Sequence, residues 1–547
     1  MRLSFLLLPL LAAAGIASAQ NAAPAPRSER ARAWWATVTT LAADSMEGRE
    51  AGSEGHRRAS ELVARRFREL GLEPAGENGT FFQAVRLEER RFDLGASTAA
   101  LARIRPAGAA PTRALIDTSE PLSIPGDIYF RATGGPPPER VNAPLVFVGY
   151  GFHLPEAGHD DFAGLDLRGK VAVVVNGQGP DRLSGALKSH ARADRARQLQ
   201  ERGAVGVITV NPLGASEQNW SAASRIATMP GMYPADPQVR TLRSPFLTAV
   251  LNPASAARLF AGSGQDFAAI SAAARAGRPI AGGALTWRFI ARPVTTSRAV
   301  ETRNVVARLP GSDPRLRGEH VLLSAHLDGL GISSPVNGDR IYNGALDNAA
   351  GVAALLDIAG KYRAERARPR RSILFVAVSG EEKGLLGSRW FARSPTVPRS
   401  SIVADLNYDM ALPLFPLRSI TTLGFEESSL GPDASAVGAQ MGLPIAPDPF
   451  PERNSFVRSD QYSFIEEGIP SLAFKFGFAA GTPEARIEAA WRRDIYHSPQ
   501  DDSSQRVFAD DEIRLHDFIA ALALRVANAD ARPRWNDNSF FRRFARE

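Results

Sequence analysis

The stretch VLLSAHLDG, residues 321–329, decides the fold because an apolar run passes directly into His326 and Asp328. A short apolar run of this kind is typical of a buried strand. Two later stretches repeat the arrangement, ILFVAVSGEE at residues 373–382 and IVADLNYD at residues 402–409. Segments with a helical repeat of apolar residues separate the strands. This alternation predicts an α/β domain with a central mixed, mostly parallel sheet sandwiched by helices.

Acidic side chains and one histidine follow the carboxyl ends of these strands. In an open α/β sheet, ligands bind at that edge. The residues that we expect there are His326, Asp328, Asp347, Glu381, Glu382 and Asp409. Taken singly, each has an ordinary structural explanation, such as a helix N-cap for an Asp or a solvated turn for a Glu pair. Together, the carboxylates would repel one another strongly unless cations neutralise them, and a pair of divalent metals would do so.

Five segments resemble, in order and spacing, the motifs of the M28 family of zinc peptidases, which are two-zinc aminopeptidases and their carboxypeptidase relatives. They are AHLDGLG at 325–331, NGALDNAAG at 343–351, SGEEKGLLGS at 379–388, NYDM at 407–410 and YHSPQDD at 496–502. The resemblance extends to EGR at 47–49 with Gly71-Leu72, and to RSD at 458–460 with GIP at 468–470.

This resemblance implies a centre with two zinc ions. His326 and Asp409 would bind one ion, Glu382 and His497 would bind the other, and Asp347 would bridge both. Each ion would then receive one imidazole and two carboxylates, and a position would remain open for water.

The resemblance also implies roles beside the metal ligands. Asp328 would orient the imidazole of His326 as a carboxylate behind the ligand. Glu381 would take the proton from the attacking water and pass it to the leaving amine, so that it acts as general base and then general acid.

Two further candidates have structural alternatives. Tyr496 would donate a hydrogen bond to the oxyanion, or it would simply pack beside the ligand that follows it. Arg458 would lie near the substrate carbonyl, or it would form a structural ion pair with Asp460. Gln461 stands where the family often has His, which leaves the contacts on the substrate side open. At Asp347-Asn348 the resemblance implies a cis peptide bond.

The apolar run LAFKFGF at residues 472–478 has two interpretations. It could line a hydrophobic pocket that favours Leu, Met or Phe at the N-terminus of a peptide. It could equally be a central strand, because the strands of a parallel sheet are covered on both faces.

The chain divides into four predicted parts. Residues 1–19 are expected to be a signal peptide, because Arg2, a short apolar run and Ala17-Ser18-Ala19 match its three regions. Residues 20–123 would be the N-terminal part of the peptidase domain and residues 286–547 its catalytic part. Between them, residues 124–285 resemble the mostly β protease-associated (PA) domain that is inserted in many M28 members. That insert is expected to limit substrates to short peptides.

Composition excludes several classes of protein and of site. The 547 residues include no Cys, which excludes disulfides, thiolate nucleophiles and zinc sites built on sulfur. A lipid-modified cysteine is excluded as well.

The net charge of +7 comes from scattered Arg residues, so we expect no nucleic-acid partner. No later run reaches the ~20 apolar residues that a membrane span needs. The apolar stripe of the last helix, residues 512–528, fits either packing on the sheet or dimer formation, so the oligomeric state stays open.

The sequence therefore predicts a periplasmic or secreted two-zinc aminopeptidase that acts on peptides. Three alternatives remain at this point: a carboxypeptidase of the same family, a single-zinc glutaminyl cyclase, and a catalytically silent binding protein with a PA domain. Silent relatives lose ligands, and this chain retains the full set of five.

Overall fold

The computed structural model describes residues 23–104, 116–132, 134–214, 220–225 and 229–545. The predicted signal peptide, residues 1–19, lies outside them and stays a prediction. The chain forms two compact units, one made of Met1–Val85 with Glu301–Glu547 and the other of Arg86–Val300.

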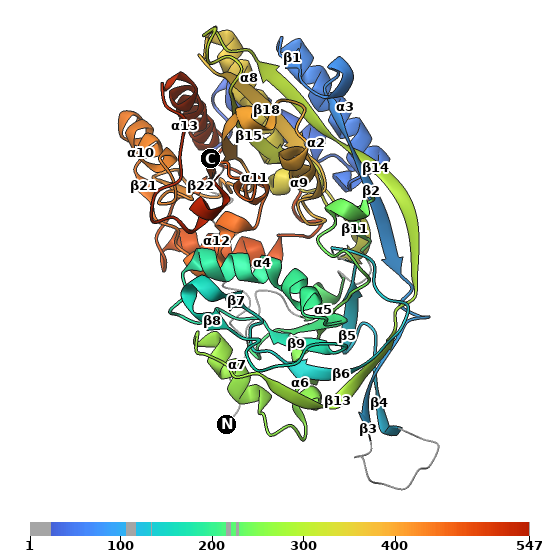
Figure 1. Ribbon diagram of the computed structural model, residues 1–547. Coiled ribbons are helices and arrows are strands. Elements are labelled where there is room, and N and C mark those ends of the chain that lie inside the picture. The colour runs from blue at the N-terminus through green and yellow to red at the C-terminus, as the bar shows by residue number, and fades with distance from the viewer. Residues whose placement is uncertain (1–22, 105–115, 133, 215–219, 226–228, 546–547) are drawn as a thin grey trace, which may run out of the picture. The chain divides into compact units, whose positions relative to one another are not determined.

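The first unit is built on a mixed sheet (Figure 1). Its four central strands, β18, β15, β19 and β22, are parallel neighbours in that order. Their bounds are Ser372–Val378, His320–His326, Ile402–Asn407 and Ser471–Phe476. On one side follows β14 (Thr295–Leu309), then β2 (Phe82–Phe92); on the other follow β20 (Ile420–Leu423) and β21 (Ile445–Ala446). Antiparallel pairs, such as β14 with β18 and β20 with β22, flank the parallel centre.

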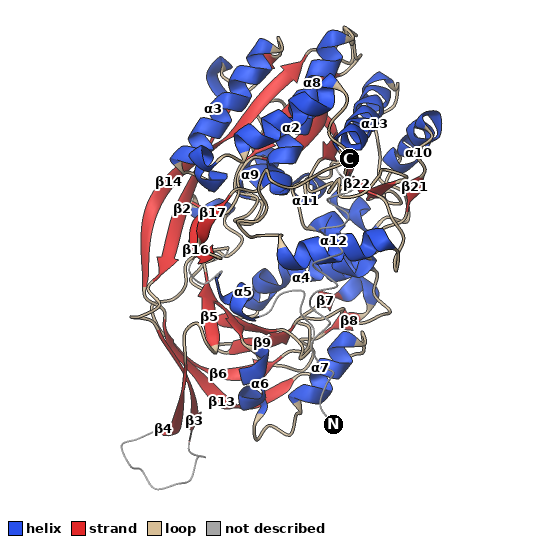
Figure 2. Cartoon of the chain, turned by 180° about the vertical axis from the view of Figure 1, so that it is seen from behind, coloured by secondary structure: helices blue, strands red, loops and turns tan. Residues whose placement is uncertain are grey.

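Helices cover both faces of this sheet because successive strand residues point to opposite sides. On one face Val321, Leu323 and Ala325 of β15 join a core with α2 (Glu29–Leu41), α3 (Glu54–Glu69), α8 (Ala350–Ala364) and α13 (Ala509–Asn528). On the other face Leu322 packs with α9 (Leu386–Arg393) and α11 (Gln461–Ile465). Figure 2 shows α2 and α8 side by side against the sheet. The predicted α/β class is confirmed.

The apolar run at residues 472–478 is largely strand β22, which is buried between β19 and β20. The last predicted helix is α13, whose apolar stripe packs into the core of its own unit.

The helical stretch at the N-terminal end is interrupted by a tight turn. A 3-10 turn at Asp44–Arg49 separates α2 from α3, and Glu47, Gly48 and Arg49 adopt positive φ there. A side chain at Gly48 would lie 2.6 Å from the main-chain carbonyl oxygens of Gly331 and Tyr342. Glycine is therefore required at this position. Because the main chain at Gly48 passes so close to Gly331 and Tyr342, the neighbouring Arg49 lies in the interior.

The second unit is also built on one sheet, in the order β4-β3-β13-β6-β9-β10-β12-β5. The bounds are Ile116–Leu122, Thr98–Ile104, Gly283–Arg292, Val141–Phe147, Val171–Val175, Gly206–Val210, Leu247–Leu251 and Ile128–Arg131. Helices α4 (Gly185–Glu201), α6 (Pro253–Phe260) and α7 (Phe267–Arg275) belong to the same unit. The unit is wider than the expected insert at 124–285, because β3 and β4 pair within the same sheet as β13. Its kinship with PA domains stays a prediction.

A buried ionic cluster ties three helices of the first unit together. His516 of α13 lies with Nδ1 2.9 Å from Oδ2 of Asp357 in α8, and with Nε2 3.1 Å from Oε1 of Glu512. Arg30 of α2 pairs with the same Asp357 carboxylate at 2.6 Å. Burial opposes the charged imidazolium, but the carboxylates of Asp357 and Glu512 outweigh burial and raise the pKa of His516 to about 9. The rings of Trp34 and Tyr408 enclose the imidazole.

This cluster predicts that stability declines as the pH rises through about 9. The folded-state pKa of His516 is above the unfolded value of 6.5, so its contribution is complete below pH 6.5 and is lost toward pH 9 and beyond. The difference corresponds to on the order of 3 kcal/mol. The free energy of unfolding by denaturant, measured at pH 6 and pH 9.5 for the native chain and for His516→Gln, should show a gap that shrinks at high pH. An equal gap at both values would contradict the assignment.

Candidate metal centre

The carboxyl ends of the parallel strands meet at one edge of the sheet. His326 is the last residue of β15 and pairs in register with Val378 at the end of β18, three residues before Glu381. Asp409 follows the end of β19 by two residues. The fold therefore delivers the predicted side chains to one place.

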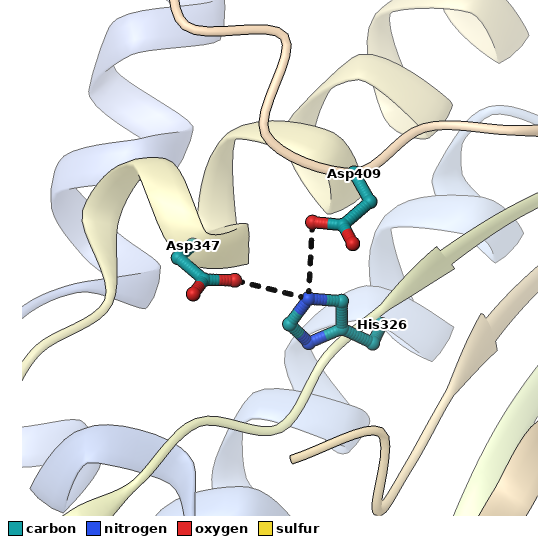
Figure 3. A group of neighbouring side chains, drawn as sticks. All are labelled: His326, Asp347 and Asp409. Atoms are coloured by element: carbon teal, nitrogen blue, oxygen red, sulfur yellow. Dashed lines mark ion pairs between the residues drawn. The ribbon is translucent and has the colours of Figure 1, made fainter. Parts of the chain in front are cut away.

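Two groups of possible metal ligands form there, and they share Asp347. The first is His326, Asp347 and Asp409, shown in Figure 3, and the second is Asp347, Glu382 and His497. In the first, His326 Nε2 lies 3.2 Å from Asp347 Oδ1 and 3.5 Å from Asp409 Oδ1. In the second, His497 Nε2 lies 3.2 Å from Asp347 Oδ2 and 3.3 Å from Glu382 Oε2. The two carboxylate oxygens of Asp347 thus face different imidazoles.

The donor set fits zinc. Each group offers one imidazole nitrogen and two carboxylate oxygens, as in hydrolytic zinc sites that keep a position open. His326 Nε2 and Asp409 Oδ1 are buried, and neither forms a hydrogen bond of good geometry within the described part of the chain. Burial alone would lower the pKa of His326, but the carboxylates of Asp347 and Asp409 raise it well above its usual value. The site therefore attracts positive charge.

Asp347 is held by main-chain contacts from a distant segment. The carboxylate of Asp501 accepts the N–H groups of Leu346 and Asp347, each at 2.9 Å, and the Asp501 carbonyl accepts the N–H of Ala345 at 2.9 Å. The Asp347–Asn348 peptide bond is cis, as expected. Asp501 lies four residues after His497, so the segment that carries one candidate ligand also positions another.

The carboxylate of Asp328 takes a different partner from the one expected. It accepts the main-chain N–H groups of Glu381 at 3.1 Å and Glu382 at 3.3 Å. The His326 Nδ1–H instead donates to the main-chain carbonyl of Asp328 at 3.2 Å, whereas the Asp328 carboxylate oxygen lies 3.9 Å from Nδ1. The carbonyl of Asp328 is thus the hydrogen-bond partner of the imidazole, and the carboxylate anchors the turn that bears both glutamates; that this carboxylate orients the imidazole stays a prediction.

Arg49 is a buried residue to which the sequence assigned no role. Its guanidinium donates to the carbonyls of Leu327, Leu41, Asn343 and Gly344, at distances between 2.6 and 2.9 Å. Two of these carbonyls flank the candidate ligands, since Leu327 follows His326 and Gly344 precedes Asp347.

The charge of Arg49 also bears on the centre. Burial lowers the pKa of Arg49 to about 10, against the pull of the Asp501 and Asp328 carboxylates, so the guanidinium stays charged at neutral pH. It supplies a fixed positive charge behind the acids.

Glu381 belongs to the same edge but to neither ligand group. Burial and the charges of Glu382 and Asp409 raise its pKa well above the usual value, while the charge of His326 opposes this shift. Tyr496 stacks on the ring of His497, with ring centroids 3.7 Å apart. The packing interpretation of Tyr496 is therefore observed.

Arg458 does not form the ion pair considered as its alternative. It is exposed, and among the ion pairs of the described residues none joins it to Asp460. The carboxylate of Asp460 is buried instead, without a hydrogen bond among those residues. Gln461 is buried, accepts from Asn407 Nδ2 at 2.7 Å and donates to the carbonyl of Phe456 at 2.8 Å. Gln461 thereby links Asn407, the last residue of β19, to the main chain at Phe456.

Comparison with known proteins agrees with this geometry. The sequence profile described as Peptidase family M28 matches residues 304–523, which contain all five candidate ligands. This segment belongs to peptidase family M28. A probable zinc metalloprotease of Pyrenophora teres f. teres is 34% identical over 125 residues, which cover 22% of this chain and 26% of that protein. A vacuolar membrane protease of Lachancea thermotolerans is 33% identical over 114 residues, which cover 20% of this chain and 10% of that protein.

A solved structure extends the similarity of fold. The aminopeptidase from Aneurinibacillus sp. strain AM-1 aligns with a TM-score of 0.50 and 17% identity, covering 92% of this chain and 94% of that one. At that identity the likeness concerns the fold. The chain spans about a quarter or less of the length of the two relatives named above. Among the described residues, no helix has the length and apolar character that a membrane crossing demands.

The contacts of Arg49 predict that even lysine cannot replace it. An ammonium has three donors and cannot reach four carbonyls spread around a planar fork. Arg49→Lys should lower the free energy of unfolding by about 2–4 kcal/mol, because buried carbonyls lose their partners. Arg65→Lys on the exposed face of α3 is the matched control, since Arg65 only pairs loosely with Glu69 at 4.0 Å. Equal midpoints in thermal or denaturant unfolding would refute this role.

Proposed function

We propose that this M28 peptidase is an exported two-zinc aminopeptidase that hydrolyses the N-terminal residue of peptides. The observation that carries the proposal is the pair of ligand groups that share Asp347, each with one imidazole and two carboxylates. The family match of residues 304–523 supports a peptide hydrolase that depends on zinc. Export rests on the sequence of residues 1–19 alone.

In this proposal His326 and Asp409 would hold one zinc, Glu382 and His497 would hold the other, and Asp347 would contribute to both. Zinc pairs of this kind polarise a substrate carbonyl and make water a nucleophile near neutral pH. The chain supplies the geometry. Its ligands come from strand ends and from turns that Arg49 and Asp501 hold by main-chain contacts.

Glu381 is the proton carrier in the proposed reaction. It lies on the same turn as Glu382, and the Asp328 carboxylate fixes the main-chain N–H groups of both residues. A carboxylate so held can accept a proton from the attacking water and return it to the leaving amine. Tyr496, stacked on His497, would donate its hydroxyl to the developing oxyanion, and the exposed Arg458 would contact the substrate carbonyl.

The charge around the centre favours a free amino terminus over a free carboxyl terminus. Besides the candidate ligands, the buried carboxylates of Asp328, Asp460 and Asp501 surround the site, together with Glu381. Two zinc ions would neutralise the three ligand carboxylates, so the remaining acids, to the extent that they are ionised, would attract an α-ammonium group and repel an α-carboxylate. The fold likeness to a protein described as an aminopeptidase agrees with this preference.

The direct test measures zinc content by elemental analysis and assays a small substrate panel. We expect two zinc ions per chain, rapid hydrolysis of aminoacyl-p-nitroanilides and dipeptides with free amino ends, and negligible hydrolysis of the N-blocked peptides that carboxypeptidases cleave. One zinc with cyclisation of N-terminal glutamine would favour the cyclase alternative. Absence of zinc and of all hydrolysis would favour a silent binding protein.

Glu381→Gln should leave both zinc ions in place and lower kcat by several orders of magnitude. The amide keeps the shape of the side chain but cannot accept the proton of water. Steady-state kinetics of the zinc-loaded variant would measure this, with Glu365→Gln on the exposed end of α8 as the control that should retain full activity. Turnover within tenfold of the native rate would remove Glu381 from the mechanism.

Asp347→Asn should release zinc, because an amide in place of the bridging carboxylate leaves both ions one anionic ligand short. Elemental analysis after dialysis should give well under two zinc ions per chain, while Asp433→Asn on α10 (Leu430–Met441) retains both. Full zinc content in Asp347→Asn would contradict the bridging role.

A further inference from the structure

An aromatic-walled pocket lies beside the candidate metal centre in the first unit. It encloses about 450 Å³, including space open to solvent. Its apolar lining includes Met410, Leu412, Phe415, Phe450, Phe476 and Phe478. Phe478 contacts both Phe415 and Phe450, with ring centroids 5.5 and 5.9 Å apart. We call it the Lys475 pocket after the lysine that also lines it.

Two contacts connect the Lys475 pocket to candidate zinc ligands. Lys475 Nζ donates to the main-chain carbonyls of Asp409 at 3.1 Å and Met410 at 3.2 Å. On another wall, the guanidinium of Arg492 lies 5.5 Å from the ring centroid of Tyr496, which stacks on His497. The pocket therefore borders the ligand segments of both proposed zinc ions.

The pocket carries one more cation than anion. Its charged lining consists of Lys475, Arg453 and Arg492 against Asp448 and Glu488. Glu488 is engaged by both arginines, with Arg453 Nη1 at 2.8 Å. Asp448 accepts the main-chain N–H of Phe450 at 2.9 Å.

Lys475 stands apart from these pairs. Its two hydrogen bonds go to neutral carbonyls, and among the described residues it forms no ion pair, although the carboxylates of Asp409, Glu488 and Asp347 act on its charge from farther away. An ammonium has three donors, so one remains for another acceptor. An ammonium group without a direct ion pair, set among phenylalanine rings, favours a ligand that brings a carboxylate.

We propose that the Lys475 pocket receives the side chain of the N-terminal substrate residue and that Lys475 selects an acidic side chain, glutamate above its neutral isostere glutamine. This inference rests on the proposed aminopeptidase function and deepens it. The methylene groups of glutamate would lie against the aromatic walls, and its carboxylate would take the remaining donor of Lys475. The sequence left open whether residues 472–478 line a hydrophobic pocket for Leu, Met or Phe or form a central strand, and this proposal gives Lys475 of that strand a role in the pocket.

The first measurement separates binding from catalysis. Calorimetric titration of the zinc-loaded full chain with free L-glutamate and with L-glutamine requires no turnover. We expect glutamate to bind about tenfold to a hundredfold more tightly, the range for a hydrogen bond to a charged group. The kcat/KM values for glutamyl- and glutaminyl-p-nitroanilide should differ by a similar factor.

The second measurement assigns the preference to Lys475. Lys475→Met keeps the length and apolar stem and removes the charge, so the glutamate-to-glutamine ratio should fall to about one in both assays. Lys475→Arg, which retains a cation, should keep glutamate ahead. Lys361→Met is the matched control, because Lys361 pairs with Glu365 and Asp517 on the far helices. It should leave the ratio unchanged.

The outcomes distinguish this inference from the proposed function. Equal binding of glutamate and glutamine by the native chain, or an unchanged ratio in zinc-replete Lys475→Met, overturns the role of Lys475 even if other aminoacyl substrates are cleaved. If the native chain cleaves no substrate but still prefers glutamate in calorimetry, the aminopeptidase assignment fails while the pocket stands. Should Lys475→Met lose its zinc, Phe478→Ala provides a second test, since it should weaken glutamate binding without abolishing the preference over glutamine.

Discussion

Mutual repulsion among buried carboxylates is the constraint on which the rest of this structure depends. Asp347, Glu382 and Asp409 converge with two imidazoles at one edge of the sheet, and Asp328, Asp460 and Asp501 lie buried around them. Such an arrangement is costly in a folded protein unless positive charge is held among the acids. The geometry accommodates that charge in two places, on either side of Asp347. The fixed charge of Arg49 adds a third, permanent contribution.

The protein positions its acids mainly through the main chain. Arg49 joins carbonyls beside His326 and before Asp347, Asp501 holds the N–H groups that lead into Asp347, and Asp328 holds those of Glu381 and Glu382. These contacts fix the turns, and the turns fix the ligands. A site whose ligands are already oriented loses little conformational entropy when it binds its cations.

Much of this could be predicted from the sequence because it follows local rules. Apolar runs that end in His326, Glu381 or Asp409 specify strands and the edge at which they end, and the positions of these residues in five motifs supply the ligand set. Other features depend on contacts between distant segments. The residues next to Arg49 in the chain do not indicate that it has four carbonyl partners. The partners of the Asp328 carboxylate, Glu381 and Glu382, lie on the turn after a different strand, β18. In the sequence Lys475 is one residue of an apolar strand, and only the structure shows that it lines a pocket. Likewise the second unit begins at Arg86, since strands β3 and β4 join its sheet from outside the expected insert.

The central claim is that the two ligand groups hold two zinc ions bridged by Asp347. A crystal structure of the zinc-loaded chain, with anomalous diffraction recorded above and below the zinc absorption edge, tests it most directly. The account predicts two anomalous peaks ~3.5–4 Å apart, one beside His326 and Asp409 and the other beside Glu382 and His497, with an Asp347 oxygen on each. A single peak, or peaks that leave Asp347 without a metal on either oxygen, would contradict it.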